Sequence, residues 1–275
     1  MNEAPQTSFR AELKFLADLS QPLVYVPSKG GGDQTEHVGN YRNHEVEIHD
    51  ARRALSGTDL DREGFVLVSH ESAVDDFYDD DALQSIYHPE MIELLKRRTG
   101  AQRVEIFDDT RRSSTVSSQQ AHGTRDPANI VHNDYTHDSG PRRLSDFFGD
   151  SPEEAEKLRQ GRFAIINAWR PIGEPVVDHP LVLCDARTVG EGNLVPVERR
   201  GEDRIGELQV ALHDPRQRWY YYPRMDRDEV LFFKTYDSAT DGTTRFTPHS
   251  SCKDPRAPDD APPRESLETR CLVFY

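Results

Sequence analysis

The sequence predicts a mainly β protein with a few helices packed outside the β core. Short runs of strand-forming residues recur along the whole chain, at a spacing typical of β-sandwiches and barrels. Helical candidates are fewer and lie between those runs. A length of 275 residues also suits a single all-β domain. We therefore expect one domain over residues 1–275.

The expected strands are short and are separated by turn-forming residues. In the first half of the chain they cover residues 23–26, 45–49, 65–70, 103–107 and 129–135. In the second half they cover residues 162–169, 180–186, 207–212, 218–223, 228–236, 245–251 and 268–275.

Four helices are expected, at residues 8–19, 73–85, 88–99 and 151–160. The third has Pro89 at its start and Gly100 just past its end, which is the usual order of helix punctuation. The fourth begins with Ser151 as a cap and Pro152 in the first turn. The first would make residues 1–20 a peripheral N-terminal helical segment.

Charge and composition exclude several classes of protein. The chain has 49 acidic and 34 basic residues, and this net charge of −15 repels the phosphates of nucleic acid. No run approaches the about 20 apolar residues of a membrane helix, and the N-terminus lacks a signal-peptide pattern. Cys184, Cys252 and Cys271 form no metal-binding or disulfide pattern. We expect a cytoplasmic protein with reduced thiols.

The segment Ile-Val-His-Asn-Asp-Tyr at 130–135 is the most informative for chemistry. A strand places residues i and i+2 on the same face, so His132 and Asp134 would point to one place. Such a pair supplies two of the three ligands of a facial iron(II) site. Chance alone predicts about two His-x-acid pairs in this composition. The other, His88 and Glu90, spans a proline at a helix start, where the two side chains diverge.

Residues further along the chain could complete such a site. His249 lies on an expected strand and offers a third ligand. Arg264, Ser266 and Arg270 follow it. An arginine can hold the carboxylate of a co-substrate through two parallel hydrogen bonds.

This combination resembles the iron(II)- and 2-oxoglutarate-dependent oxygenases. Further blocks, in the same order over roughly residues 20–275, resemble their CmcJ/AsaB-type branch, which is related to cephamycin methoxylases and includes many fungal natural-product hydroxylases and desaturases. The blocks are NAWRP at 167–171, PLVLCDAR at 180–187, WYYYP at 219–223, DEVLFFKTYDS at 228–238 and RESLETR at 264–270.

The resemblance implies a double-stranded β-helix, the jelly roll of the cupin-like proteins. It implies that His132, Asp134 and His249 are the catalytic residues that hold Fe(II), with 2-oxoglutarate as co-substrate and O2 as oxidant. It also implies oxidation of an unactivated C–H bond of a small-molecule secondary metabolite. Hydroxylation, desaturation and oxidative cyclisation are the reactions of this kind, and 2-oxoglutarate becomes succinate and carbon dioxide.

Two arginines compete for the distal carboxylate of 2-oxoglutarate. Arg264-x-Ser266 matches the motif of the family. Strand register favours Arg270 if residues 253–263 are an insertion in a hairpin that joins the strand of His249 to the last strand. We prefer Arg270 and retain Arg264 and Ser266.

Four further residues are candidates for the substrate pocket, and two other functions remain open. The pocket candidates are Arg170, Asn167, Trp169 and Tyr135. Arg170 binds a substrate carboxylate in one interpretation and forms a structural ion pair in the other. The alternative functions are a cupin-like metalloenzyme that uses the same triad without 2-oxoglutarate, and a non-catalytic partner subunit with the same fold. A homodimer is left open.

Overall fold

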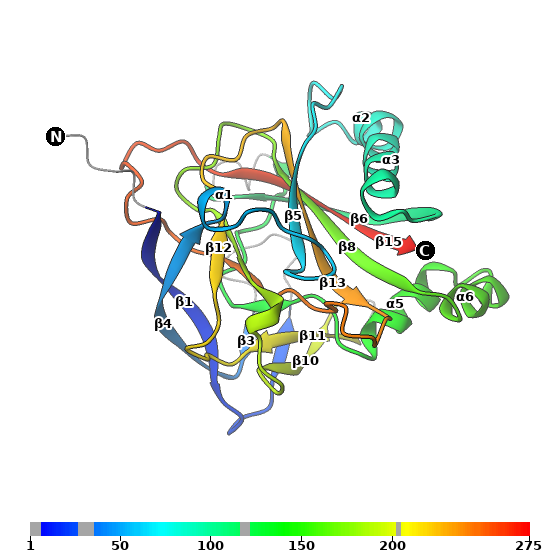
Figure 1. Cartoon of the computed structure of the whole chain (residues 1–275), viewed down its shortest axis with the longest axis horizontal. Helices are drawn as coiled ribbons and strands as arrows, with labels where there is room; N and C mark the ends of the chain where they lie inside the picture. Colours follow the sequence, from blue (N-terminus) through cyan, green and yellow to red (C-terminus); the bar gives the residue numbers. More distant parts are fainter. Residues whose placement is uncertain (1–6, 27–35, 116–121, 202–204) are drawn as a thin grey trace.

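The computed structural model describes residues 7–26, 36–115, 122–201 and 205–275, which form two facing β-sheets with helices outside them (Figure 1). In spatial order, the ten strands of the larger sheet are β1 (Ser8–Asp18), β4 (Asn40–Asp50), β12 (Trp219–Tyr221), β9 (Leu181–Cys184), β14 (His249–Ser251), β7 (His132–Asn133), β11 (Ile205–Ala211), β10 (Leu194–Arg200), β2 (Val24–Val26) and β3 (Glu36–Val38). The five strands of the smaller sheet are β5 (Phe65–Ser69), β13 (Glu229–Asp237), β8 (Phe163–Pro171), β15 (Glu265–Phe274) and β6 (Arg103–Ser113).

The larger sheet curls on itself. Lys14 of β1 bridges to Ile130, just before β7, and Leu16 bridges to Leu212, just after β11. These contacts bring one edge of the sheet back to its middle, as expected for a strongly twisted sheet. The mainly β architecture with flanking helices is confirmed.

Helices α2, α3, α5 and α6 lie on the right of Figure 1, and two of them, α3 and α6, were predicted from the sequence. The helical elements are α1 (Ala51–Ala54), α2 (Asp80–Ala82), η2 (Leu83–Tyr87), α3 (His88–Thr99), α5 (Ser139–Phe147), α6 (Pro152–Arg159) and η3 (Ala186–Thr188). Gly100 ends α3 with φ of +74°, where glycine is favoured. The helix expected at 73–85 begins only at Asp80. No helix in the described ranges is both long and apolar enough to cross a membrane.

Packing of α3 decides which face of the smaller sheet points inward. The helix buries its apolar side against one face of β8 and β15. This outer cluster includes Met91, Leu94, Leu95, Ala164, Ile166 and Ala168. Because side chains alternate along a strand, Asn167 and Trp169 of β8 face the larger sheet. The functional residues described below lie in this interior.

The helix predicted at residues 8–19 is wrong, because these residues form β1. The strand pairs antiparallel with β4 along its whole length. Phe9, Ala11, Leu13 and Phe15 alternate along it and are buried. This two-residue period is typical of a strand, but the intervening Glu and Lys residues are good helix formers and favoured the helical interpretation. Residues 8–18 therefore belong to the sheet.

Candidate active site

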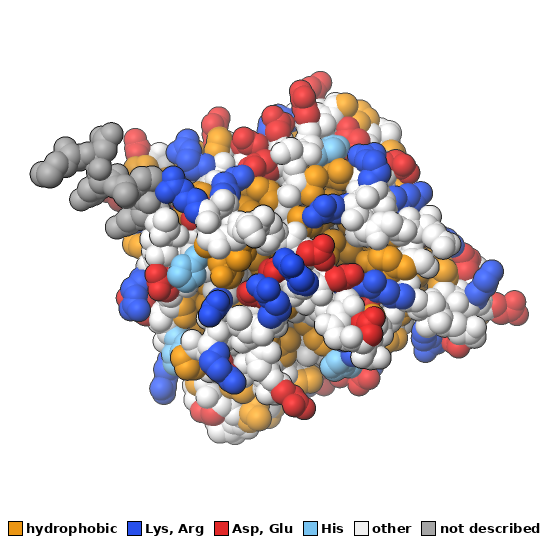
Figure 2. Space-filling model, viewed as in Figure 1, with side chains coloured by type: hydrophobic (Ala, Val, Ile, Leu, Met, Phe, Trp, Pro, Cys, Tyr) orange, Lys and Arg blue, Asp and Glu red, His pale blue; other side chains and the backbone are white. Residues whose placement is uncertain are grey.

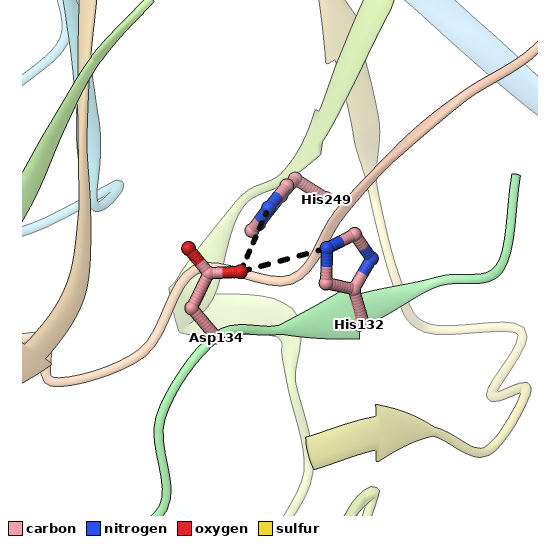
Figure 3. Close-up of side chains that lie close together, drawn as sticks. All are labelled: His132, Asp134 and His249. Carbon is pink, nitrogen blue, oxygen red and sulfur yellow. Dashed lines mark ion pairs between the residues drawn. The ribbon is translucent and has the colours of Figure 1, made fainter. Parts of the chain in front are cut away.

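His132, Asp134 and His249 converge in the interior of the fold (Figure 3). The two histidines are directly opposed in the antiparallel pair of β7 and β14, and Asp134 follows two residues after His132. Oδ1 of Asp134 lies 3.6 Å from Nε2 of His132 and 3.9 Å from Nε2 of His249. All three ligand atoms lie within 4.8 Å of one another. The structure thus brings the predicted triad together.

Backbone carbonyls orient both imidazole rings. Nδ1 of His132 lies 2.8 Å from the carbonyl of Ile130, and Nδ1 of His249 lies 3.0 Å from that of Thr247. Since a carbonyl only accepts, each Nδ1 carries the hydrogen and each Nε2 keeps a lone pair. Burial lowers the pKa of His132 to about 4 and also lowers that of His249. Both rings are therefore neutral, which is the form that binds a metal.

The carboxylate of Asp134 is held through its second oxygen. Oδ2 accepts hydrogen bonds from Nδ2 of Asn167 at 2.8 Å and from Nε of Arg270 at 3.1 Å. Burial alone would raise the pKa of Asp134, but Arg270, the two histidines and the hydrogen bond from Asn167 together outweigh burial and hold this pKa well below its usual range. The carboxylate is thus ionised with Oδ1 available. Two imidazoles and one carboxylate form the donor set of a facial iron(II) site.

Arg270 is saturated by carboxylates. Besides Asp134, its guanidinium donates to Asp108 and Glu268. Its positive charge is therefore already matched by neighbouring negative charges. This places Arg270 beside the triad, as the register argument expected, but as a partner of Asp134.

Arg264, unlike Arg270, is not paired with a carboxylate among the residues that the structure describes. It is 2% exposed and donates to the carbonyl of His179 and to Oγ of Ser251, and within the described residues no carboxylate lies within 4 Å of it. Its Nε and the hydroxyl of Ser266 have no hydrogen-bond partner. Burial lowers the pKa of Arg264 to about 9. Buried donors left unpaired in this way indicate a missing acceptor.

The hairpin that favoured Arg270 in the sequence analysis does not form. β14 pairs with β7 and β9, whereas β15 pairs with β6 and β8. The strand of His249 and the last strand therefore lie in different sheets and form no hairpin. A narrow pocket between them is lined by Arg264, His249 and Trp169.

Three of the four pocket candidates reach the site. Asn167 bonds Asp134, the ring of Trp169 lies 5.7 Å from the guanidinium carbon of Arg264, and Tyr135 lines the main cavity. Burial raises the pKa of Tyr135 to about 12, so its hydroxyl stays protonated.

Arg170 is not brought to the site. It is fully buried on the outer face of β8, 5.1 Å from the ring centre of Phe77 and 5.3 Å from that of Tyr87. It donates to the carbonyl of His70 at 2.8 Å. Strand alternation separates it from Asn167 and turns it toward the helices.

His132 and Asp134 lie at the wall of a cavity of about 740 Å³, and His249 lines the narrow pocket. This volume suits a small organic molecule. Its lining includes Tyr135 and Arg270, and also Tyr25, His37 and Tyr41 from the strands at the edge of the larger sheet. The cavity is therefore large enough for a substrate beside the metal ligands.

Asn133 supports the site and was missed from the sequence. It points away from its two neighbours, and its Nδ2 donates to the carbonyls of Tyr135 and Thr235 at 2.7 and 3.0 Å. Its Oδ1 accepts from the backbone N–H of Thr247, two residues before His249. Asn133 thus ties the two ligand-bearing segments together. A polar residue between two same-face ligands on a strand is the signal that could have identified it.

Comparison with known proteins agrees with this geometry. A family model described as "Oxidoreductase/YMDC permease-like domain" matches residues 13–274. The chain is 35% identical to "Fe(II)/2-oxoglutarate-dependent dioxygenase nvfI" of Aspergillus novofumigatus (strain IBT 16806), over 94% of this chain and 92% of that one. It is 34% identical to "Hydroxylase/desaturase CTB9" of Cercospora beticola, over 90% and 83%.

Solved structures show the same likeness. Two structures of the "iron and alpha-ketoglutarate-dependent endoperoxidase NvfI" superimpose with TM-scores of 0.85 and 0.82, at 31% and 33% identity. The alignments cover 99% of both chains in the first case and 98% in the second.

The fold and the site thus define a jelly-roll enzyme of the non-haem iron class. The chain belongs to the family of iron(II)- and 2-oxoglutarate-dependent oxygenases of natural-product biosynthesis. The predicted fold, enzyme class and cofactors (Fe(II), 2-oxoglutarate and O2) are confirmed, and the two alternative functions are not supported.

Proposed function

We propose that His132, Asp134 and His249 hold the iron with which this enzyme oxidises a C–H bond of a small-molecule natural product. The observation that carries this proposal is the convergence of two neutral imidazoles and one ionised carboxylate, with ligand atoms within 4.8 Å. Iron(II) bound there, with 2-oxoglutarate and dioxygen, supplies the oxidising power for C–H cleavage.

Arg264 and Ser266 receive the distal carboxylate of 2-oxoglutarate in this proposal. Both are buried, and both have donors without partners. A carboxylate accepts two parallel hydrogen bonds from a guanidinium, which would satisfy Nε of Arg264. Arg270 keeps Asp134 ionised and oriented instead.

Neighbouring side chains shape the two spaces around the metal ligands. Asn167 orients Asp134, Trp169 forms a wall of the narrow co-substrate pocket, and Tyr135 forms a wall of the main cavity. Hydroxylation, desaturation and oxidative cyclisation all begin from C–H oxidation. The placement of the substrate in the cavity decides among these products.

Anaerobic titration with iron(II) and 2-oxoglutarate tests the assignment. The wild type is expected to develop the weak visible band of the iron chelate and, after oxygen is admitted, to form succinate slowly without substrate. His132→Ala and Asp134→Ala are expected to lose both signals, because each removes a metal ligand. His88→Ala is a matched control, since His88 pairs with Asp109 and does not line the cavity. Succinate formation by both ligand variants would disprove the assignment.

We further propose that residues 1–275 act as one oxygenase domain in the cytoplasm. Cys184, Cys252 and Cys271 are buried and unpaired, which suits a reducing compartment. The proposed partner is a small molecule, and neither nucleic acid nor a membrane is expected. Light scattering of the purified chain determines whether it forms the homodimer that the sequence left open.

A further inference from the structure

The main cavity is positively charged in an acidic protein. Its described lining contains seven Lys and Arg residues against five Asp and Glu, whereas the whole chain carries a net charge of −15. The outer surface seen in Figure 2 mixes both signs. A cationic lining beside the metal ligands therefore contrasts with the rest of the molecule and favours an anionic ligand.

Arg112 is a cation of this lining that lacks an ion pair within the described part of the chain. It lies on β6 directly opposite Ser266 of β15, and it borders both the main cavity and the narrow pocket of Arg264. Its Nη1 donates to the carbonyl of Asp126 at 2.7 Å, and it forms no ion pair with a carboxylate of the described residues. The guanidinium group of Arg112 is enclosed by protein at the cavity wall. This desolvation lowers the pKa of Arg112.

The other two arginines near the metal ligands already have partners in the proposed arrangement. Three carboxylates already occupy Arg270. Of the two carboxylates of 2-oxoglutarate, one belongs at the metal and the other at Arg264. The charge of Glu268 acts on Arg112, but Glu268 already accepts a hydrogen bond from Arg270. An enclosed guanidinium without an ion pair of its own is costly, so an anion bound beside Arg112 would be stabilised.

A second arginine lies next to Arg112 on the cavity side. Arg125 bridges to Arg112 in parallel, and its backbone N–H donates to the carbonyl of Arg111 at 3.1 Å. Both side chains line the cavity. Two neighbouring guanidinium groups fit the planar geometry of a carboxylate.

The cavity lining also contains an aromatic cluster. The ring centres of Tyr25 and His37 lie 4.9 Å apart, and those of His37 and Tyr41 lie 6.3 Å apart, edge to face. Such a surface packs well against a flat or cyclic carbon skeleton. The cavity lining thus offers both cationic and aromatic groups.

We propose that the substrate is a ring-containing small molecule with a free carboxylate, which Arg112 binds with the help of Arg125. The ring skeleton lies against Tyr25, His37 and Tyr41, and the anionic end fixes which carbon faces the metal ligands. This inference rests on the proposed function, since it concerns the same cavity.

Pairs of model acids and their methyl esters test the inference. Benzoic, cyclohexanecarboxylic and 2-naphthoic acids and their esters are titrated calorimetrically into anaerobic enzyme loaded with iron(II) and 2-oxoglutarate. At least one acid is expected to bind at least about tenfold more tightly than its ester, because the ester cannot form the charge-assisted pair. Arg112→Gln is expected to abolish this preference. Arg112→Lys is expected to retain part of it, since the charge remains.

Arg142→Gln is the matched control, because Arg142 is exposed at the rim of the same cavity. It is expected to keep the preference for the acid. Equal binding of acids and esters by the wild type, or an undiminished preference in Arg112→Gln, would overturn the inference. A loss of 2-oxoglutarate binding in Arg112→Gln as large as in Arg264→Gln would assign Arg112 to the co-substrate and also overturn it. Failure of the proposed function is seen separately, as absence of the chelate band and of succinate in the wild type without any probe.

Discussion

Asn167 and Arg270 are directly opposed in the antiparallel pair of β8 and β15, and both donate to the same oxygen of Asp134. Their two hydrogen bonds occupy Oδ2 and leave Oδ1 facing the histidines. The proposed metal site is therefore supported by the smaller sheet, although its three residues come from the larger sheet and the segment just after β7. These two hydrogen bonds connect the smaller sheet to the carboxylate that faces the two histidines.

Asn167→Ala should weaken iron binding while the protein stays folded. Loss of a supporting hydrogen bond to a metal ligand typically lowers metal affinity by about 10–100-fold. Anaerobic iron(II) titration measures the change. Asn43→Ala is a control, because Asn43 bonds Glu12 on the exposed side of β4. An unchanged iron affinity in Asn167→Ala would show that Arg270 alone orients Asp134.

Arg264→Gln and Arg270→Gln should have separable effects. Arg264→Gln is expected to raise the 2-oxoglutarate concentration required for succinate formation, with iron binding retained, since a lost charge-assisted pair costs about 2–5 kcal/mol. Arg270→Gln is expected to weaken iron binding, because Asp134 loses its positive neighbour. Iron and 2-oxoglutarate titrations of both variants distinguish the roles. The reverse pattern would restore Arg270 as the anchor.

Lys234→Met should strongly destabilise the fold. Lys234 is fully buried, and its Nζ lies 2.7 Å from a carboxylate oxygen of the equally buried Asp237. Removal of one partner of a buried pair costs about 3–5 kcal/mol. Lys96→Met is the control, since its surface pair with Glu93 at 3.4 Å is worth about 0–1 kcal/mol. Urea unfolding measures both, and equal losses would contradict the prediction.

The three thiols should be unreactive in the native protein. Burial raises the pKa of Cys184 and of Cys252 to about 12, and it raises that of Cys271 as well. The reactive thiolate forms only as the pH approaches the pKa, so alkylation at pH 8 should be slow and should accelerate with rising pH. Mass spectrometry after iodoacetamide treatment counts the labelled thiols. Urea-unfolded protein should label fully at pH 8, and rapid native labelling of any thiol would contradict the prediction.

Local signals in the sequence predicted some elements well and others wrongly. Gly100 and Pro89 bounded α3 correctly, because capping and the missing proline N–H act within a few residues. In β1, buried residues such as Phe9 and Leu13 alternate with charged residues. Those charged residues are strong helix formers, so the segment also resembled a helix. Pairing with β4 decided the outcome, since tertiary contacts override weak propensities.

By itself the sequence predicted that His132 and Asp134 share a face and, through the family resemblance, that His249 joins them. Spacing along one strand carries that information, because adjacent side chains alternate. Only the tertiary structure decided that Arg170 faces the helices, that carboxylates saturate Arg270, and that Arg112 faces the cavity. Those outcomes depend on which strands are opposed and on which face a helix covers. Contacts between residues far apart in the chain create these relationships, and no local pattern encodes them.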